Sequence, residues 1–179
     1  MHIQPLEPRQ HFAFGGAQAD FGDGGAFVPS NIGNDPLQSA LPAYDGGILA
    51  ASHRRIMYIT QQGNLRPSFA TGGVLQLEVG LTSLGSDDTG RIYALTNDAA
   101  IRRFTPRGKV DTSFGNRGKV NIDFVSGFTP KALAVGSNGS FEVAGSTHTP
   151  SDSMLLRFNA DGTPLLINVT CPQFLYHLL

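Results

Sequence analysis

Residues 112–118, which read Thr-Ser-Phe-Gly-Asn-Arg-Gly, decide the fold because two earlier segments of the chain repeat their pattern. Residues 19–25 read Ala-Asp-Phe-Gly-Asp-Gly-Gly, and residues 67–73 read Pro-Ser-Phe-Ala-Thr-Gly-Gly. Each segment has a phenylalanine, a small residue, two variable positions and a closing glycine, with an apolar stretch after it. A segment that returns at a spacing of several tens of residues marks a repeat protein.

Two kinds of glycine-containing turn accompany this segment, in the same order in every repeat. Glycine suits tight hairpin turns because it adopts positive φ angles without steric cost. The first turn occurs at residues 44–47, 88–91 and 137–140, and the second at residues 61–64, 106–109 and 160–163. The three markers together define three units, at residues 15–63, 64–108 and 109–162.

Short apolar and β-branched stretches separate the turns and predict four antiparallel strands in each unit. The predicted strands are residues 26–32, 38–43, 48–53, 55–60, 74–79, 81–86, 91–96, 100–105, 119–124, 131–136, 141–146 and 154–159. The fold class predicted is all-β, with β-propeller-type blades of four antiparallel strands. Residues 15–165 then hold three blades and a remnant, between an N-terminal segment (residues 1–14) and an atypical tail (residues 166–179).

The burial of two strands is predicted from their composition. Residues 132–135, Ala-Leu-Ala-Val, are apolar at every position, so we expect this strand to be buried on both faces. In residues 100–105, Ile101 and Phe104 are separated by two arginines. That pattern favours an outer, partly exposed strand.

Residues 110–120, Val-Asp-Thr-Ser-Phe-Gly-Asn-Arg-Gly-Lys-Val, closely resemble a segment of the delta-60 repeat family of bacterial proteins. Residues 131–145 and 155–163 are similar to two further segments of that family, and the resemblance covers residues 15–165. It implies a β-propeller, and many members are large surface-associated or secreted proteins of undefined function. It implies no catalytic motif. The recurring positions are then structural, and they are Phe21, Phe69, Phe114, Gly25, Gly73 and Gly118.

The composition agrees with short strands and argues against some partners. The chain has 22 glycines and 11 prolines, and only 15% of its residues are charged. Its net charge is −1 and its longest basic run is residues 53–55, so the basic stripe of a nucleic-acid-binding protein is missing. No stretch approaches the ~20 apolar residues that span a bilayer, and residues 1–10 lack the features of a secretory signal. We expect a soluble protein without a nucleic-acid partner, and its location stays open.

No constellation of residues predicts a catalytic, cofactor-binding or metal site. The single cysteine, Cys171, excludes an internal disulfide. Residues 87–90 and 159–162 faintly resemble calcium loops, but hairpin turns in which Asp and Asn cap their own backbone explain them more simply. The histidines lack the spacing of a metal-binding pair. They are His2, His11, His53, His148 and His177.

The predicted function is a non-catalytic repeat scaffold whose loops bind a protein or a carbohydrate. Function concentrates in loops on rigid scaffolds, and residues 147–152 form the most individual loop of the third unit. The alternative is an enzyme with Asp, Glu or His at the propeller axis, for which the first strands of the units offer Glu78 and Asp123. A fragment without independent function is a third reading.

The repeat pattern fails after Gly162, where another unit would have to begin. Residues 164–170 lack the expected Phe segment, and residues 174–179 form an apolar end; this tail resembles either a truncated or frame-shifted remnant or a capping strand. An open stack of blades exposes apolar faces and unpaired strand edges. We therefore expect the ends to be covered by self-association, by the N-terminal segment or by a partner chain.

Overall fold

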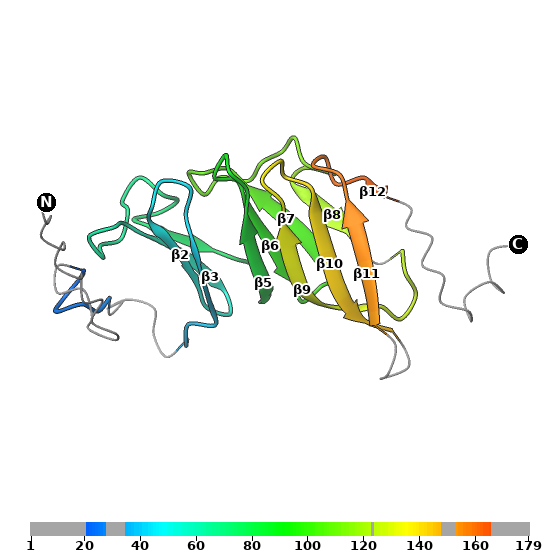
Figure 1. Cartoon of the computed structure of the whole chain (residues 1–179), viewed down its shortest axis with the longest axis horizontal. Helices are drawn as coiled ribbons and strands as arrows, with labels where there is room; N and C mark the ends of the chain where they lie inside the picture. Colours follow the sequence, from blue (N-terminus) through cyan, green and yellow to red (C-terminus); the bar gives the residue numbers. More distant parts are fainter. Residues whose placement is uncertain (1–20, 28–34, 123, 148–152, 166–179) are drawn as a thin grey trace, which may run out of the picture.

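The chain folds into three small antiparallel β-sheets that follow one another along the sequence (Figure 1). The computed structural model describes residues 21–27, 35–122, 124–147 and 153–165. Every regular element in these ranges is a strand, which confirms the predicted all-β class. No helix in the same ranges is long and apolar enough to cross a membrane.

Each sheet contains four strands. The first has the order β1-β2-β3-β4, the second β5-β6-β7-β8 and the third β12-β11-β10-β9. The bounds are Ser39–Pro42 (β1), Ile48–Ala51 (β2), Arg55–Ile59 (β3), Val74–Gln76 (β4), Leu81–Ser86 (β5), Ile92–Thr96 (β6), Ala100–Phe104 (β7), Lys119–Asn121 (β8), Thr129–Val135 (β9), Phe141–Ser146 (β10), Ser153–Phe158 (β11) and Pro164–Leu165 (β12). The strands lie close to the predicted ranges, and both kinds of predicted hairpin turn are present.

The last strand of the first two sheets comes from the following sequence unit, which corrects the predicted grouping. The sequence predicts residues 74–79 as the first strand of the second unit, but β4 pairs with β3 at the outer edge of the first sheet. β8 pairs with β7 in the same way. The cause is the repeated phenylalanine segment, whose tight turn brings the chain back antiparallel to the strand it has just left. We call residues 21–25, 69–73 and 114–118 the first, second and third Phe motifs.

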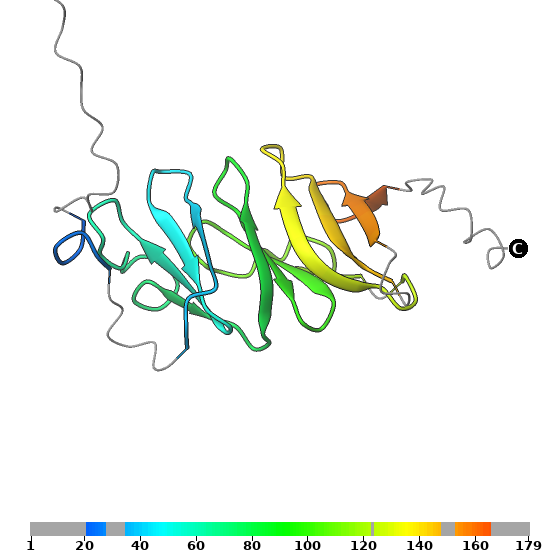
Figure 2. The same cartoon turned by 60° about the horizontal axis from the view of Figure 1, so that its bottom comes forward.

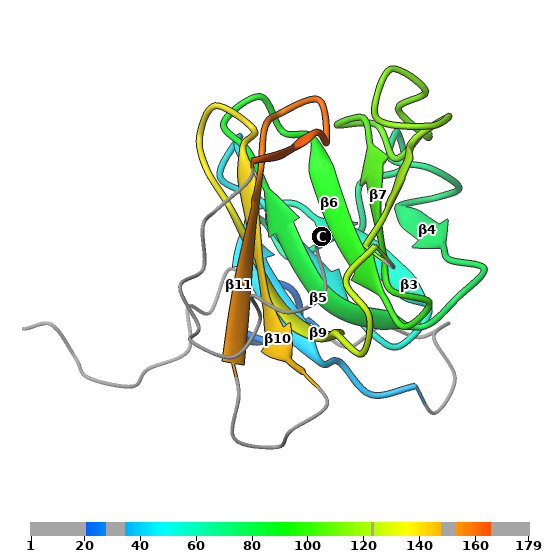
Figure 3. The same ribbon diagram turned by 90° about the vertical axis from the view of Figure 1, so that its right-hand side faces the viewer.

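The sheets converge at one edge and fan apart at the other (Figures 2 and 3). Contacts between sheets join β1 to β5 and β5 to β9, which are therefore the inner strands. The backbone N–H of Leu133 in β9 donates a hydrogen bond to Ser83 Oγ in β5 at 3.2 Å. At Gly85 a Cβ atom would meet Val135 at 2.5 Å, so β5 and β9 lie too close for a side chain there. Four-stranded sheets that radiate from an inner edge are propeller blades, and the chain forms a partial propeller of three.

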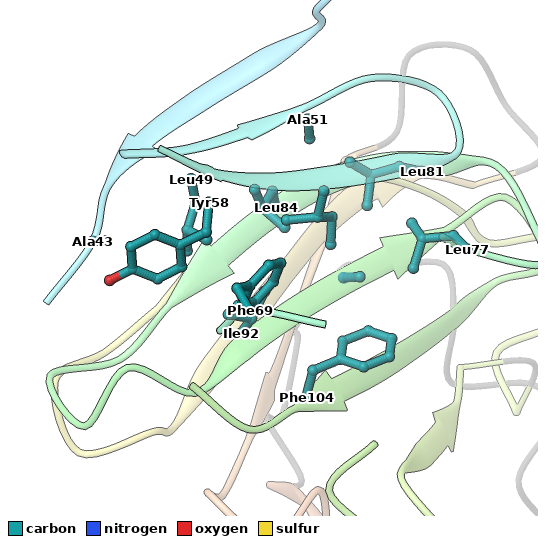
Figure 4. Packing of buried hydrophobic residues seen from close by; sticks show 12 residues of the cluster. Ala43, Leu49, Ala51, Tyr58, Phe69, Leu77, Leu81, Leu84, Ile92 and Phe104 are labelled. Atoms are coloured by element: carbon teal, nitrogen blue, oxygen red, sulfur yellow. The ribbon is translucent and has the colours of Figure 1, made fainter. Parts of the chain in front are cut away.

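The middle blade is buried on both faces. All five residues of β6 are buried, and its side chains alternate between two hydrophobic cores. Ile92 and Ala94 belong to the core between the first and second blades (Figure 4), whereas Tyr93 and Leu95 belong to the core between the second and third. We call the face of each blade that points toward the next blade its forward face, and the opposite one its rear face.

Two burial predictions are wrong, and the position of each strand in the blades explains why. Residues 132–135 lie in β9 of the third blade, where Ala132 and Ala134 are exposed because no described residue covers its forward face. Residues 100–105 do not form an outer strand, because β8 lies outside β7 and buries it. The predicted strand 26–32 and the residue Asp123 lie mostly or wholly outside the described residues.

A repeated hydrogen bond joins each Phe motif to the blade that follows it. The residue after the phenylalanine has a positive φ angle, which turns its N–H toward the carbonyl that precedes the glycine of the next blade's second turn. The three bonds run from Gly22 N to Gln62 O (2.9 Å), from Ala70 N to Arg107 O (2.9 Å) and from Gly115 N to Asp161 O (3.3 Å). The φ angles of the three donors are 59°, 42° and 50°.

The Phe motifs pack so closely on the turn glycines of the next blade that a side chain would not fit at those glycines. A Cβ atom on Gly108 would lie 3.0 Å from the Phe69 ring, and one on Gly162 would lie 3.2 Å from the Phe114 ring. Both rings are fully buried in the cores. The phenylalanine and the turn glycine are therefore two parts of one contact between blades.

We predict that Gly73→Ala destabilises the chain more than Gly72→Ala does. Both glycines have positive φ angles, 92° and 60°, but a Cβ on Gly73 would meet Leu65 Cβ at 2.8 Å whereas nothing lies within 4 Å of one on Gly72. Backbone strain alone should cost about 1–2 kcal/mol at Gly72, and the steric clash should add about 1–3 kcal/mol at Gly73. Urea unfolding measures both, and equal losses would contradict the packing described here.

Candidate functional site

The turns that join the first two strands of each blade lie at the same end of the sheets. They connect β1 to β2, β5 to β6 and β9 to β10, and we call their shared surface the turn face. The backbone N–H of Asp88 in the second turn donates a hydrogen bond to the carbonyl of Ser137 in the third at 3.4 Å. The ring of Tyr44 in the first turn packs so closely on Gly90 that a Cβ there would lie 2.3 Å from the ring. Neighbouring turns thus form a continuous surface.

A hollow of about 470 Å³ opens on this face between the first and second blades. Its walls combine an aromatic ring with a carboxylate, since Tyr44 is 53% exposed on one side and Asp88 is exposed on the other. Aromatic rings supply large apolar contact area, and a few polar groups fix the orientation of a ligand. The lining residues are Leu41, Pro42, Ala43, Tyr44, Ser86, Asp87 and Asp88.

Asp87, at the base of the hollow, is buried and holds its own turn together. Its Oδ1 accepts hydrogen bonds from Thr89 N (3.0 Å), Thr89 Oγ1 (2.6 Å) and Arg91 N (3.1 Å). Its Oδ2 accepts from Arg91 Nε (2.6 Å) and Tyr93 Oη (3.2 Å). Burial opposes ionisation, but the hydrogen bonds from Thr89 and Arg91 outweigh it and lower the pKa of Asp87. Because both oxygens of Asp87 accept hydrogen bonds from its own turn and from β6, we assign this carboxylate a structural role.

Arg103 links the second and third blades and is only 4% exposed. Its guanidinium donates to Asp111 Oδ2 (2.8 Å), to the Ala160 carbonyl (2.6 Å) and to Ser113 Oγ (3.2 Å). It also lies over the Phe114 ring, 4.5 Å from the centroid. Ala160 belongs to the second turn of the third blade, so this arginine ties the residues around the third Phe motif to the neighbouring sheet.

The first blade has a comparable polar cluster on its forward face. The hydroxyl of Tyr58 donates to Asp45, and Arg66 forms an ion pair with the same carboxylate at 2.6 Å. The Arg66 guanidinium lies 4.5 Å from the centre of the Tyr58 ring. Burial, together with the neighbouring Asp45 carboxylate, raises the pKa of Tyr58. A smaller hollow of about 190 Å³ opens beside this cluster.

The calcium-like segments are hairpin turns. Asp161 accepts hydrogen bonds from the backbone N–H and the hydroxyl of Thr163 (2.9 and 2.7 Å), just as Asp87 caps its own turn. In the described part of the chain, no group of three or more His, Cys, Asp or Glu residues could hold a metal ion. His53 is exposed. The other four histidines, Cys171 and the loop residues 148–152 lie outside the described ranges.

Of the two carboxylates that the enzymatic alternative places at the propeller axis, Glu78 does not lie there. Glu78 is exposed and follows β4, in the connection from the outer edge of the first blade to β5, and Asp123 lies outside the described residues. The strands that do form the inner edge are β1, β5 and β9. Their sequences, SALP, LTSLGS and TPKALAV, contain one ionisable side chain, Lys131.

Comparison with known proteins supports the fold and leaves the activity open. Neither a protein-family profile nor a curated protein sequence matches the chain. A solved structure of a protein of unknown function from Bacteroides caccae superposes with a TM-score of 0.50 at 19% identity, over 79% of this chain and 48% of that one. A quinonprotein alcohol dehydrogenase-like protein from Bacteroides thetaiotaomicron gives 0.49 at 14% identity, over 70% and 31%. The chain therefore spans about half and about a third of these two lengths.

We predict that Asp87→Asn destabilises the chain at pH 7 by about 2–4 kcal/mol, because it removes a buried carboxylate from five hydrogen bonds. The folded-state pKa of Asp87 is lowered, so its ionised form contributes stability above the unfolded-state pKa of ~3.9. That contribution is lost as the pH falls through the folded-state value. The difference between the parent and the variant should therefore shrink as urea unfolding is repeated from pH 7 down to pH 3.

The control for this experiment is Asp88→Asn, the adjacent but exposed carboxylate. It should change the free energy of unfolding by no more than about 0.5 kcal/mol. If Asp87→Asn proved as mild as Asp88→Asn, the structural role of Asp87 would be contradicted.

We predict that Arg103→Lys lowers the free energy of unfolding by about 2–4 kcal/mol although it keeps the positive charge. Lysine lacks the planar fork that reaches Asp111, Ala160 and Ser113 together, so some of these partly buried contacts would be lost while a cation stays buried. The matched control is Arg157→Lys, the exposed arginine of β11 on the third blade. Thermal unfolding that is equally insensitive to both substitutions would argue against a buried contact between blades.

Proposed function

We propose that this protein is a non-catalytic blade scaffold that binds carbohydrate on its turn face. The observation that carries the proposal is the hollow between the first and second blades, where the exposed ring of Tyr44 faces the exposed carboxylate of Asp88. An aromatic ring offers an apolar face on which a sugar ring stacks, and a carboxylate accepts hydrogen bonds from its hydroxyl groups. Ser86, Asp87 and Asp88 add polar side chains to the apolar lining of the hollow, which favours a ligand with both polar and apolar surface.

The rigidity of the site supports a binding role. Gly90 lies against one side of Tyr44, and the hydrogen bonds of Asp87 fix the turn that carries Asp88. A preorganised site loses little conformational entropy when a ligand binds. The turn face is therefore ready to bind without rearrangement.

The enzymatic alternative has less support in the described residues. A propeller enzyme needs ionisable side chains at the axis, whereas β1, β5 and β9 contribute Lys131 alone. Of the two carboxylates that line the hollow, Asp87 has its oxygens occupied by its own turn, which leaves Asp88 as a single exposed carboxylate. A general acid or base needs a free position toward the substrate.

We also infer that the chain is a member of the delta-60 repeat family. The support is the sequence of residues 110–120, 131–145 and 155–163, together with the repeated Phe motif and its place between blades. A propeller of undefined function in a bacterial protein is what the resemblance implies. The carbohydrate-binding proposal adds a function for one surface of that propeller, the turn face.

We predict that Tyr44→Ala weakens oligosaccharide binding by about tenfold or more, equivalent to about 1.4 kcal/mol. Binding is found first by screening the purified chain on an array of defined oligosaccharides and is then measured by calorimetry. Tyr44→Phe should keep the ring and most of the affinity, whereas Asp88→Asn should reduce it. Because Tyr44 is half exposed, these changes should leave the unfolding temperature nearly unchanged.

The control is Phe124→Ala, which removes an aromatic side chain with a similar exposure of 54%. Phe124 precedes β9, and its ring packs against Phe158 of the third blade, 6.2 Å between ring centroids, outside the lining of the hollow. Its removal should leave affinity unchanged. An array without any binding, or equal losses for Tyr44→Ala and Phe124→Ala, would refute the proposed function.

A further inference from the structure

No described residue covers the forward face of the third blade, although the equivalent face is buried in the other two blades. Two rows of paired residues cross this face, one through Ala134, Glu142, Arg157 and Leu165, the other through Ala132, Ala144 and Leu155. The corresponding rows of the first and second blades form the two large cores. In the third blade Leu155 and Leu165 are 43% and 40% exposed.

The third blade also lacks an outer strand among the described residues. β12 pairs with the end of β11 through Phe158 and Pro164. The equivalent pairs in the first and second blades are single β-bridges, between Ile59 and Leu65 and between Phe104 and Val110. In both blades the second residue of the pair lies in the segment that leads into a Phe motif. β12 is therefore the approach to a Phe motif, and most of the outer edge of β11 has no described neighbour.

At the other end of the stack, the described residues contain a Phe motif without a described sheet before it. The first Phe motif bonds to the second turn of the first blade through Gly22, as the later motifs bond to the blades that follow them. Phe27, the sixth residue after Phe21, packs on the rear face of the first blade. Leu75 and Val120 hold the same position after Phe69 and Phe114, and they pack on the rear faces of the second and third blades.

We propose that the third blade of one chain is completed by the first Phe motif of a second copy of the same chain. Leu75 pairs with Ile56 and Val120 pairs with Ile101. By the same register, Phe27 of one copy pairs with Leu155 of the other. The forward face of the third blade then covers the rear face of the first blade, as at the two interfaces within the chain.

The surfaces fit this assembly. Glu142 and Arg157 form an ion pair with each other, so these two charges on the forward face neutralise one another in the contact. The exposed residues Ala40 and Pro42 of β1 leave the inner part of the opposing rear face open. The contact joins two different surfaces, the third blade of one copy and the first blade of the other. Two such contacts close an assembly of two copies into a ring.

Sedimentation equilibrium of the full chain tests the assembly. We expect twice the chain mass of 19.0 kDa. Leu155→Glu, an exposed position that should not disturb the fold, should shift the mass to that of one chain, while Phe124→Glu should leave it doubled. A single-chain mass for the parent protein, or a doubled mass for Leu155→Glu with native circular dichroism, would overturn the proposal.

A cross-linking experiment tests the register itself. Phe27→Cys and Leu155→Cys are made separately in a Cys171→Ser background, and the two proteins are mixed and oxidised. Paired strand positions lie within disulfide reach, so the mixture should form a covalent species of two chains and neither protein alone should do so. A doubled mass in sedimentation without this mixed disulfide would overturn the proposed contact in favour of another one.

Discussion

The structure depends on the contact between each Phe motif and the turn of the blade that follows. A positive φ angle after the phenylalanine points one N–H at a turn carbonyl, while the ring lies in the core below a glycine. The same turn returns the chain to the edge of the blade that it has just left. One short segment therefore finishes one sheet and fastens it to the next. Small sheets with two apolar faces need such a fastening, because none can bury both faces alone.

Position in the stack decides how the same repeat is buried. β6, between two neighbours, is buried at every residue, whereas most residues of β9 and β11 in the last blade are either partly buried or exposed. The polar clusters follow this rule. Arg103 is buried because its partners come from two adjoining blades, but Arg157, at the same register position of the third blade, pairs with Glu142 and is exposed. Burial in this fold is therefore a property of the interface and of neighbouring repeats.

The sequence predicted what is local and missed what depends on neighbours. Turn glycines and short apolar stretches located the strands because both signals lie within a few residues. The assignment of residues 74–76 and 119–121 to the preceding sheets could not be predicted, since strand pairing depends on the path through the Phe motif. The burial of Arg103 was missed because arginine usually marks a surface, although Asp111 in the repeated segment was an available signal. The sequence predicted Tyr44 only as part of a turn. Its place beside the hollow could not be predicted, because it depends on packing against Gly90 of another unit.

Amide hydrogen exchange measured by NMR tests the central contact most directly. If the Phe motifs fasten the blades together, the N–H groups of Ala70 and Gly115 should exchange as slowly as those of β6, since both would open only when the stack unfolds. The amide of Thr82, an exposed residue that the strand register skips at the irregularity between Leu81 and Ser83 of β5, provides the faster reference. Rapid exchange at Ala70 and Gly115 while β6 stays protected would contradict the account, because the blades would then hold together without their motifs.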